Sequence, residues 1–182
     1  MASELVSRAA KYFDLVNSGC VWRAKSATTA AVIAPPTTAS IFTLQNNEVD
    51  GGKAYIILDV FATCIAAPAT LNNMGIMGVV NNAKVSIQTA SVTPFNLKAR
   101  SGQTYGGAGI LAAPGANVVD TGWSAFSNSV TGNIASLPGM TIYQPLNGLI
   151  VVSPGGLIGL TVIANATGVT VQLGCTWAEV QL

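Results

Sequence analysis

Residues 169–180 read VTVQLGCTWAEV, and this stretch decides the fold class. Five of its apolar side chains fall on one side of an extended chain: Val169, Val171, Leu173, Cys175 and Trp177. Three polar ones fall on the other side: Thr170, Gln172 and Thr176. A period of two is typical of a β-strand that buries one face. We therefore predict a strand with one face in a core and one polar, uncharged face.

Three more apolar runs precede this strand, at residues 140–144, 149–153 and 157–164. The separating sequences are rich in turn formers: PLNG at 145–148, PGG at 154–156 and NATG at 165–168. Four strands in about forty residues leave no room for crossover helices, so the region is predicted to be antiparallel. Ser153-Pro154-Gly155-Gly156 fits a type II turn, because Pro presets φ and Gly tolerates positive φ.

The central part of the chain adds further short strands between turns. Residues 41–44, 54–64 and 84–92 are rich in β-branched and aromatic side chains or alternate in polarity, whereas residues 66–82 have no clear pattern. About eight strands result. The predicted fold is all-β, an antiparallel β-sandwich of the jelly-roll type that covers residues 41–182.

Residues 1–40 are predicted to form an N-terminal helix and extended arm. The apolar stripe Leu5, Ala9, Tyr12, Phe13 and Val16 fits a short amphipathic helix that ends at residues 17–19. Residues 24–40 are small, rich in Thr and interrupted by two prolines, which favours an extended segment. Such a helix either docks on a partner subunit or packs on its own domain, and the sequence leaves both open.

Composition excludes several classes of partner. Only 8% of the residues are charged, 50% are hydrophobic, and the net charge is +1. Without a basic face, no nucleic-acid partner is expected. No membrane span is expected either, because residues 153–156 interrupt the longest apolar stretch, and the N-terminus has no signal-peptide pattern.

The sequence also argues against an enzyme. Histidine is absent, and Cys20, Cys64 and Cys175 form no CxxC pair, so no catalytic residue, cofactor or metal site is predicted. The cysteines are expected to be buried free thiols, and their odd number favours synthesis in a cytoplasm. Asp59 is interpreted as a strand residue facing solvent or paired with Lys53 or Lys84, and GAGILA at 107–112 as a glycine-rich loop.

Several short segments resemble small jelly-roll virion proteins of tailed bacteriophages: WRA at 22–24, PT at 36–37, LQN at 44–46, GGKAYII at 51–57, VSPGGL at 152–157 and WAEV at 177–180. The resemblance implies a capsid decoration (cement) protein or another auxiliary capsid protein in the virion. Its expected partners are copies of itself, in a homotrimer, and the major capsid protein or another virion protein. It implies no catalytic residues.

Two groups of residues are predicted to contact partners. The charged N-terminal segment, represented by Leu5, Tyr12, Phe13 and Trp22, is expected to contact the shell or a neighbouring subunit. Thr170 and Gln172, on the charge-poor C-terminal strand, are expected to lie near a symmetry axis of the oligomer.

Two alternative functions fit the same fold. One is a receptor- or carbohydrate-binding module that uses loops around Asn72 and Asn73, residues 103–105, and Trp123. The other is a coat protein that itself forms a closed shell.

Overall fold

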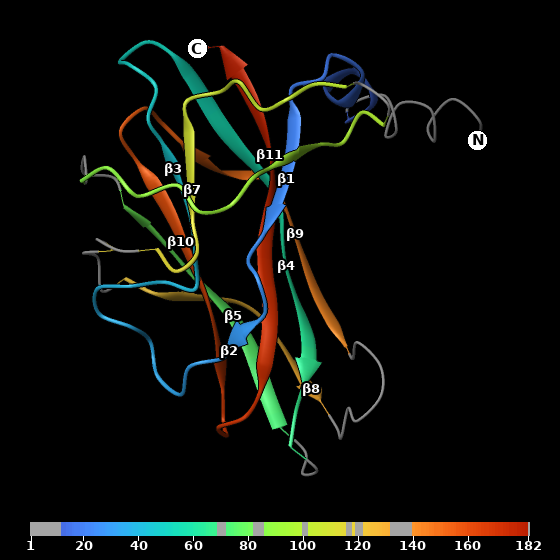
Figure 1. Ribbon diagram of the computed structural model, residues 1–182, viewed down its shortest axis with the longest axis vertical. Helices are drawn as coiled ribbons and strands as arrows, with labels where there is room; N and C mark the ends of the chain where they lie inside the picture. Colours follow the sequence, from blue (N-terminus) through green and yellow to red (C-terminus); the bar gives the residue numbers. More distant parts are fainter. Residues whose placement is uncertain are drawn as a thin grey trace.

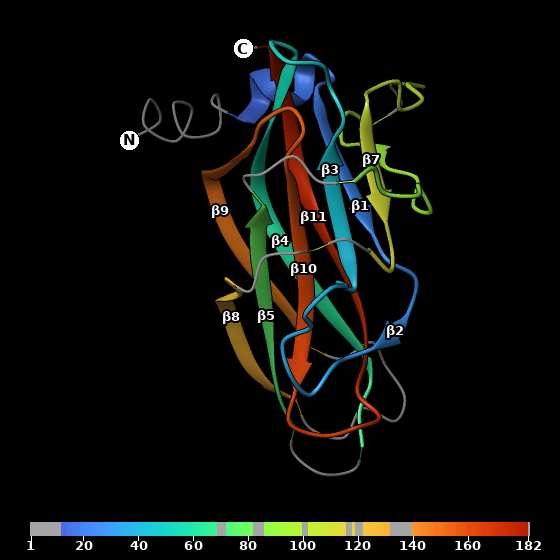
Figure 2. The same ribbon diagram turned by 90° about the vertical axis from the view of Figure 1, so that its left-hand side faces the viewer.

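The protein folds into two β-sheets packed face to face, as predicted (Figure 1). The computed structural model describes residues 12–68, 72–81, 86–99, 102–115, 118, 122–131 and 140–181. A short helix of residues 12–17 lies at one end of the sandwich (Figure 2). No helix in these ranges is long and apolar enough to cross a membrane.

Each sheet is antiparallel. The six-stranded sheet has the order β6-β1-β11-β4-β9, with β2 paired to β11 beside this path. Its strands are β1 (Val21–Lys25), β2 (Thr29–Ala30), β4 (Lys53–Ala66), β6 (Phe95–Asn96), β9 (Thr141–Val152) and β11 (Thr170–Gln181). The five-stranded sheet has the order β7-β3-β10-β5-β8. Its strands are β3 (Phe42–Asn46), β5 (Asn72–Asn81), β7 (Gly109–Ala112), β8 (Ser124–Thr131) and β10 (Leu157–Ala164).

The strand pairs are nested. β1 pairs with β11, β3 with β10, β4 with β9 and β5 with β8, all antiparallel. The chain therefore folds like one long hairpin whose two arms are rolled together into a sandwich. This nesting is the jelly-roll arrangement, and it confirms the predicted fold class.

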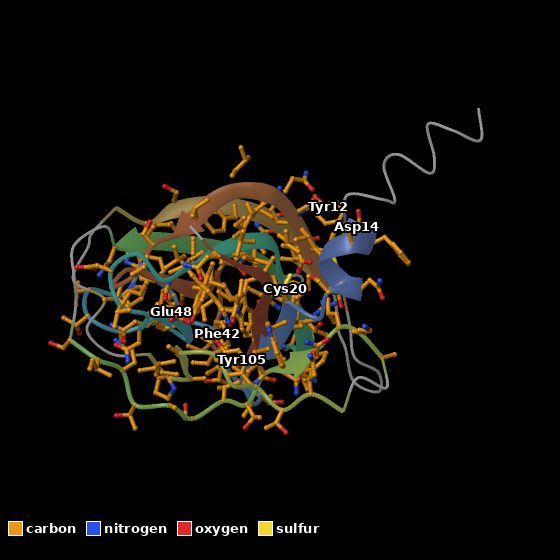
Figure 3. All side chains as sticks on the ribbon, turned by 90° about the horizontal axis from the view of Figure 1, so that it is seen from above. Tyr12, Asp14, Cys20, Phe42, Glu48 and Tyr105 are labelled. Carbon is orange, nitrogen blue, oxygen red and sulfur yellow. The ribbon has the colours of Figure 1, made fainter. Side chains whose placement is uncertain are left out.

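The core lies between the sheets and is filled by the inward side chains of both (Figure 3). The apolar face predicted for the last strand is buried as expected, with Trp177 fully covered. Tyr55 from β4 and Phe42 from β3 are the next largest fully buried side chains. The alternation in the sequence therefore identified the inward face of β11 correctly.

Most of the predicted C-terminal and central strands are confirmed. β10 has the predicted bounds, β11 begins one residue later than predicted, and β4 contains the whole of the predicted strand 54–64. The turn before β10 also has the expected geometry. Gly155 has φ of 82°, and the Gly156 N–H donates to the Ser153 carbonyl at 3.0 Å.

The predicted turn at residues 145–148 is wrong, because this sequence forms a bulge inside one long strand. Asp59 pairs with Pro145, and Ile57 pairs with Ile150, so one residue of β4 faces four residues of β9. Asn147 and Gly148 absorb the extra length with φ of 50° and 83°. Turn-forming residues occur in bulges as well as in turns. Here the segments on both sides of residues 145–148 pair with the same strand, β4, so the sequence forms a bulge and not a turn.

The predicted strand 84–92 is also not found where the structure describes it. Residues 86–92 belong to neither sheet. They are held to β3 by a side chain: the Gln88 N–H donates to Gln45 Oε1 at 2.8 Å, and Gln45 Nε2 donates to the Ser86 carbonyl at 3.3 Å. Alternating polarity does not distinguish such a segment from a strand.

The predicted arm is partly built into the sandwich. Residues 1–11, including Leu5, lie outside the described residues, and β1 forms part of the six-stranded sheet between β6 and β11. The segment after β1 contains the two residues of β2 and bends at residues 28, 33–34 and 37–38. It pairs with β11 through β2, and Val32 then pairs with Ile163 of the other sheet. Residues 29–32 therefore link the two sheets.

Candidate protein interface on the six-stranded sheet

The two outer faces of the sandwich differ in how far the chain covers them. On the five-stranded sheet, a small second hydrophobic cluster covers part of the surface: Val79, Val118 and Leu157, with Trp123 packed against it. On the six-stranded sheet, seven outward side chains are exposed or half-buried: Arg23, Lys25, Thr63, Phe95, Thr141, Tyr143 and Gln172. We call this second surface the outer sheet face.

Exposed apolar side chains follow β9, which is one edge of this sheet. Tyr143 is 55% exposed, Leu149 87% and Val151 47%. Water contact with such side chains is unfavourable by about 25 cal/mol per Å² of apolar surface. A row of them along one strand therefore favours contact with another protein.

The N-terminal helix lies against the same strand. The Tyr12 phenol donates a hydrogen bond to Asn147 Oδ1, in the bulge of β9, at 2.9 Å. Phe13 is 64% exposed beside this contact. We call Phe13, Tyr143, Leu149 and Val151 together the helix–β9 surface.

A groove of about 430 Å³ crosses the outer sheet face nearer to β1. It is lined by Arg23, Lys25, Phe61, Thr63, Phe95, Leu97, Thr141 and Gln172. The Arg23 guanidinium lies 4.0 Å above the centre of the Phe61 ring, and Lys25 Nζ donates to Gln172 Oε1 at 2.8 Å. The groove therefore combines two positive charges with an aromatic floor.

Asp59 lies on the same face, but its neighbours bury it, and it is only 7% exposed. Thr176 Oγ1 donates to one carboxylate oxygen at 2.9 Å, and the Tyr143 hydroxyl donates to the other at 3.3 Å. Burial raises the pKa of Asp59 above its ordinary 3.8, although the Thr176 hydrogen bond, the Arg23 charge and the Tyr143 hydrogen bond oppose this. The predicted pairing of Asp59 with Lys53 is wrong, because Lys53 pairs with Glu179 instead. The alternative pairing with Lys84 stays a prediction, because Lys84 lies outside the described residues.

This raised pKa predicts a pH dependence of stability. Between pH 3.8 and the folded pKa, the folded protein binds the Asp59 proton more tightly than the unfolded chain does. Asp59 therefore makes the free energy of unfolding fall as pH rises through this range. We expect Asp59→Asn to lose that part of the slope in urea unfolding at a series of pH values. Asp50→Asn should keep it, and an unchanged slope in Asp59→Asn would contradict the prediction.

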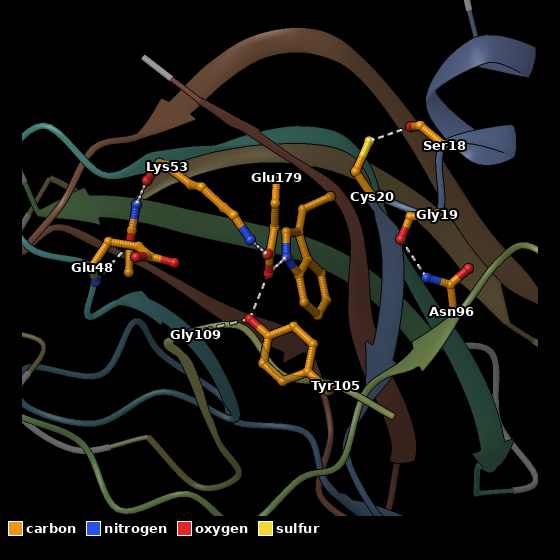
Figure 4. Close-up of polar contacts among 11 residues, drawn as sticks. Ser18, Gly19, Cys20, Glu48, Lys53, Asn96, Tyr105, Gly109 and Glu179 are labelled. Atoms are coloured by element: carbon orange, nitrogen blue, oxygen red, sulfur yellow. Dashed lines mark hydrogen bonds and ion pairs between the residues drawn. The ribbon is translucent and has the colours of Figure 1, made fainter. Parts of the chain in front are cut away.

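A second polar cluster closes one end of the sandwich around Glu179 of β11 (Figure 4). The side chain of Glu179 is 4% exposed. Its Oε1 accepts from the Tyr105 hydroxyl at 2.6 Å and from the Trp177 indole N–H at 3.4 Å, and its Oε2 lies 3.3 Å from Lys53 Nζ. The Gly109 N–H donates to the Tyr105 oxygen at 3.0 Å.

The Glu179 cluster holds a loop rather than offering a reactive group. Burial and the hydrogen bond to Glu179 raise the pKa of Tyr105, so its phenol stays protonated and donates. The glycine-rich sequence at 107–112 runs beside it, but the predicted loop is wrong for residues 109–112, which form β7 and pair with β3. A Cβ on Gly107 would lie 2.7 Å from Glu179 Oε1 and from the Tyr105 hydroxyl. These glycines therefore leave space for the Tyr105–Glu179 contact.

The predicted partner residues are distributed over three environments. Trp22 is 6% exposed, and its ring packs edge-on against Tyr105 with centroids 4.9 Å apart, so this side chain belongs to the core. Thr170 and Gln172 are half-buried on β11, and Gln172 lines the groove. Tyr12 and Phe13 adjoin β9, as described above. Neither set of predicted residues included Arg23, Lys25 or Leu149.

The cysteines are free in the structure. Cys64 and Cys175 are buried, as predicted, whereas Cys20 is half-buried. Burial raises the pKa of Cys175, so its thiol is protonated and inert at neutral pH. In the described residues, no three His, Cys, Asp or Glu side chains gather closely enough to hold a metal ion.

Comparison with protein-family models and with curated protein sequences gives no match for this chain.

Proposed function

We propose that this protein is a structural protein of a virus particle, a decoration (cement) protein that assembles as an oligomer on a viral shell. Its partners in this proposal are further copies of the chain and the major capsid protein. The outer sheet face, together with the helix–β9 surface, forms the contact between subunits. The protein has no catalytic role in this proposal.

One observation supports this function above the others: the exposed apolar side chains gather on the helix–β9 surface. Five of the nine large hydrophobic side chains that are exposed in the described residues lie in or next to β9, or on the adjoining helix: Phe13, Met140, Tyr143, Leu149 and Val151. With 8% charged residues, the molecule also has little charge repulsion to keep copies apart. Apolar, charge-poor surfaces of this kind are typical of subunit interfaces.

The binding-module alternative receives less support, because its predicted loops do not form one site. Asn72 and Asn73 lie within β5, and Asn72 is buried. The Tyr105 hydroxyl is engaged by Glu179, and Trp123 packs against the second hydrophobic cluster. None of these arrangements resembles an open platform for a sugar.

The proposal is tested by the mass of the purified full chain, measured by light scattering after size exclusion over a range of concentrations and at high salt. We expect a discrete, salt-resistant oligomer, with a trimer as the expected size. Leu149→Glu should shift it to monomer, because a charge would be buried in the apolar contact. The Leu149→Glu monomer should still unfold in a single cooperative thermal transition, because Leu149 is 87% exposed within one subunit and the substitution does not disturb the core.

Ile87→Glu is the matched control. Ile87 is also a large exposed aliphatic side chain, at 65%, but it belongs to the segment beside β3 on the other sheet. It should leave the oligomer intact. A wild-type chain that stays monomeric at all concentrations would refute the proposal, and closed particles seen by electron microscopy would instead identify a coat protein.

A further inference from the structure

The groove on the outer sheet face has the chemistry to bind an acidic protein segment with an apolar tip. Arg23 and Lys25 supply two positive charges, and Phe95, 50% exposed, supplies an apolar wall. The one ion pair among the described residues joins Lys53 to Glu179, so neither groove cation makes a direct ion pair there, although the Arg23 charge acts on the nearby Asp59 carboxylate. Asp59, on the same face, is already engaged by Thr176 and Tyr143, as described above.

The chain itself has a segment of this kind. Glu48-Val49-Asp50 forms the tip of the loop between β3 and β4, at the end of the sandwich (Figures 1 and 2). Val49 is 78% exposed, and Asp50 is exposed beside it. The Gly52 N–H donates to the Val49 carbonyl at 2.8 Å, which keeps this tip folded as a tight turn. An aliphatic side chain is thus presented to solvent between two carboxylates.

This loop does not reach the groove of its own molecule. β4 begins at Lys53, directly after the loop, and first lines the groove at Phe61 and then at Thr63. Eight to ten strand residues separate these points, which is roughly 26–33 Å at about 3.3 Å per residue. An occupant with this sequence must therefore come from a second copy of the chain.

We infer that the Glu48-Val49-Asp50 loop of one copy docks in the Arg23–Lys25 groove of the next copy. This inference rests on the proposed oligomer and specifies its contact. The Asp50 carboxylate faces Lys25, the Glu48 carboxylate faces Arg23, and Val49 packs against Phe95. The end of one subunit thus meets the broad face of its neighbour, so the contact is heterologous and closes into a ring when the rotation between copies permits. Charge complementarity fixes the orientation of the contact.

A charge exchange tests this contact. Lys25→Glu places an acid opposite the acidic loop, and Asp50→Lys places a base opposite the basic groove. Each change alone should weaken association by at least about tenfold, measured as the concentration dependence of mass in light scattering. The double variant Lys25→Glu/Asp50→Lys reverses both partners, so its association should return to within about threefold of wild type.

Two controls address unrelated charge effects. Thr167→Glu and Thr167→Lys introduce the same new side chains in the exposed turn between β10 and β11, and both should associate like wild type. Thermal unfolding of each variant verifies that it is folded, which is expected because Lys25 and Asp50 are exposed.

The outcomes separate this inference from the proposed function. If the wild type is oligomeric but the single variants associate normally, or the double variant is weaker than both, the loop-to-groove contact is refuted and the oligomer stands. If the wild type is monomeric, both are refuted. If only the double variant regains association, both are supported.

Discussion

Replacing Glu179 with alanine is expected to lower the free energy of unfolding by about 2–4 kcal/mol, since buried donors would lose their acceptor. The Tyr105 hydroxyl and the Trp177 indole N–H both donate to Glu179 Oε1, and the Glu179 side chain is only 4% exposed. Loss of this oxygen also removes the hydrogen bond through which Tyr105 holds its own loop against the end of the sandwich. Urea unfolding followed by tryptophan fluorescence measures the change.

Two variants separate the parts of the Glu179 cluster. Glu179→Gln keeps an acceptor oxygen at the same place, so its loss should be clearly smaller than that of Glu179→Ala. Lys53→Met removes only the ion pair, and because the Lys53 side chain is 44% exposed, we expect a loss below about 1 kcal/mol. An equal loss in Lys53→Met and Glu179→Ala would show that the ion pair, and not the buried hydrogen bonds, stabilises this end.

Replacing Gly174 with alanine should destabilise the fold by about 3 kcal/mol, through overpacking between two paired strands. Gly174 of β11 pairs with Lys25 of β1 and with Phe61 of β4. A Cβ at this position would collide with the carbonyl oxygen of Ala24 and lie 2.8 Å from the Lys25 Cα, which are backbone atoms that cannot rotate away. β1 would have to move off β11 and would displace Lys25 from the groove.

Gly106→Ala is the matched control, because a Cβ there meets nothing within 4 Å. Its free energy of unfolding should stay within about 0.5 kcal/mol of wild type. We expect Gly174→Ala also to weaken self-association, measured by light scattering under conditions where the variant is folded. A Gly174→Ala variant as stable as Gly106→Ala would contradict the close approach of β1 and β11.

Strands whose inward face is continuous could be predicted from the sequence alone. β10 and β11 each have an uninterrupted apolar set on one side, and Gly155 directs the turn before β10. β1 and β5 were not predicted. β1 has five residues, and β5 contains Gly75 and Gly78, so neither has a local pattern strong enough to define it. These strands form because strands far away in the sequence pair with them. A local sequence pattern carries no information about such distant partners.

The candidate interface was also predictable only in part, because it too depends on residues that are distant in the sequence. Tyr12 and Phe13 were recognised through the helical stripe, and Gln172 through the polar face of β11. The groove, however, joins Arg23 of β1, Phe61 of β4 and Phe95 of β6. These residues are far apart in the sequence and become neighbours through strand order. Trp22, predicted to face a partner, is buried instead because Tyr105 covers it.

The nested strand pairing also determines when the molecule can fold during synthesis. Trp22 pairs with Trp177, so β1 leaves the ribosome long before its neighbour β11 exists. The innermost pair, β5 and β8, is the earliest of the four nested pairs that can be completed, and the outermost pair is the last. Pairings of such large sequence separation are slow to form and leave strand edges open meanwhile. Newly made chains therefore pass through a period in which β1 is free to pair with the last strand of another copy.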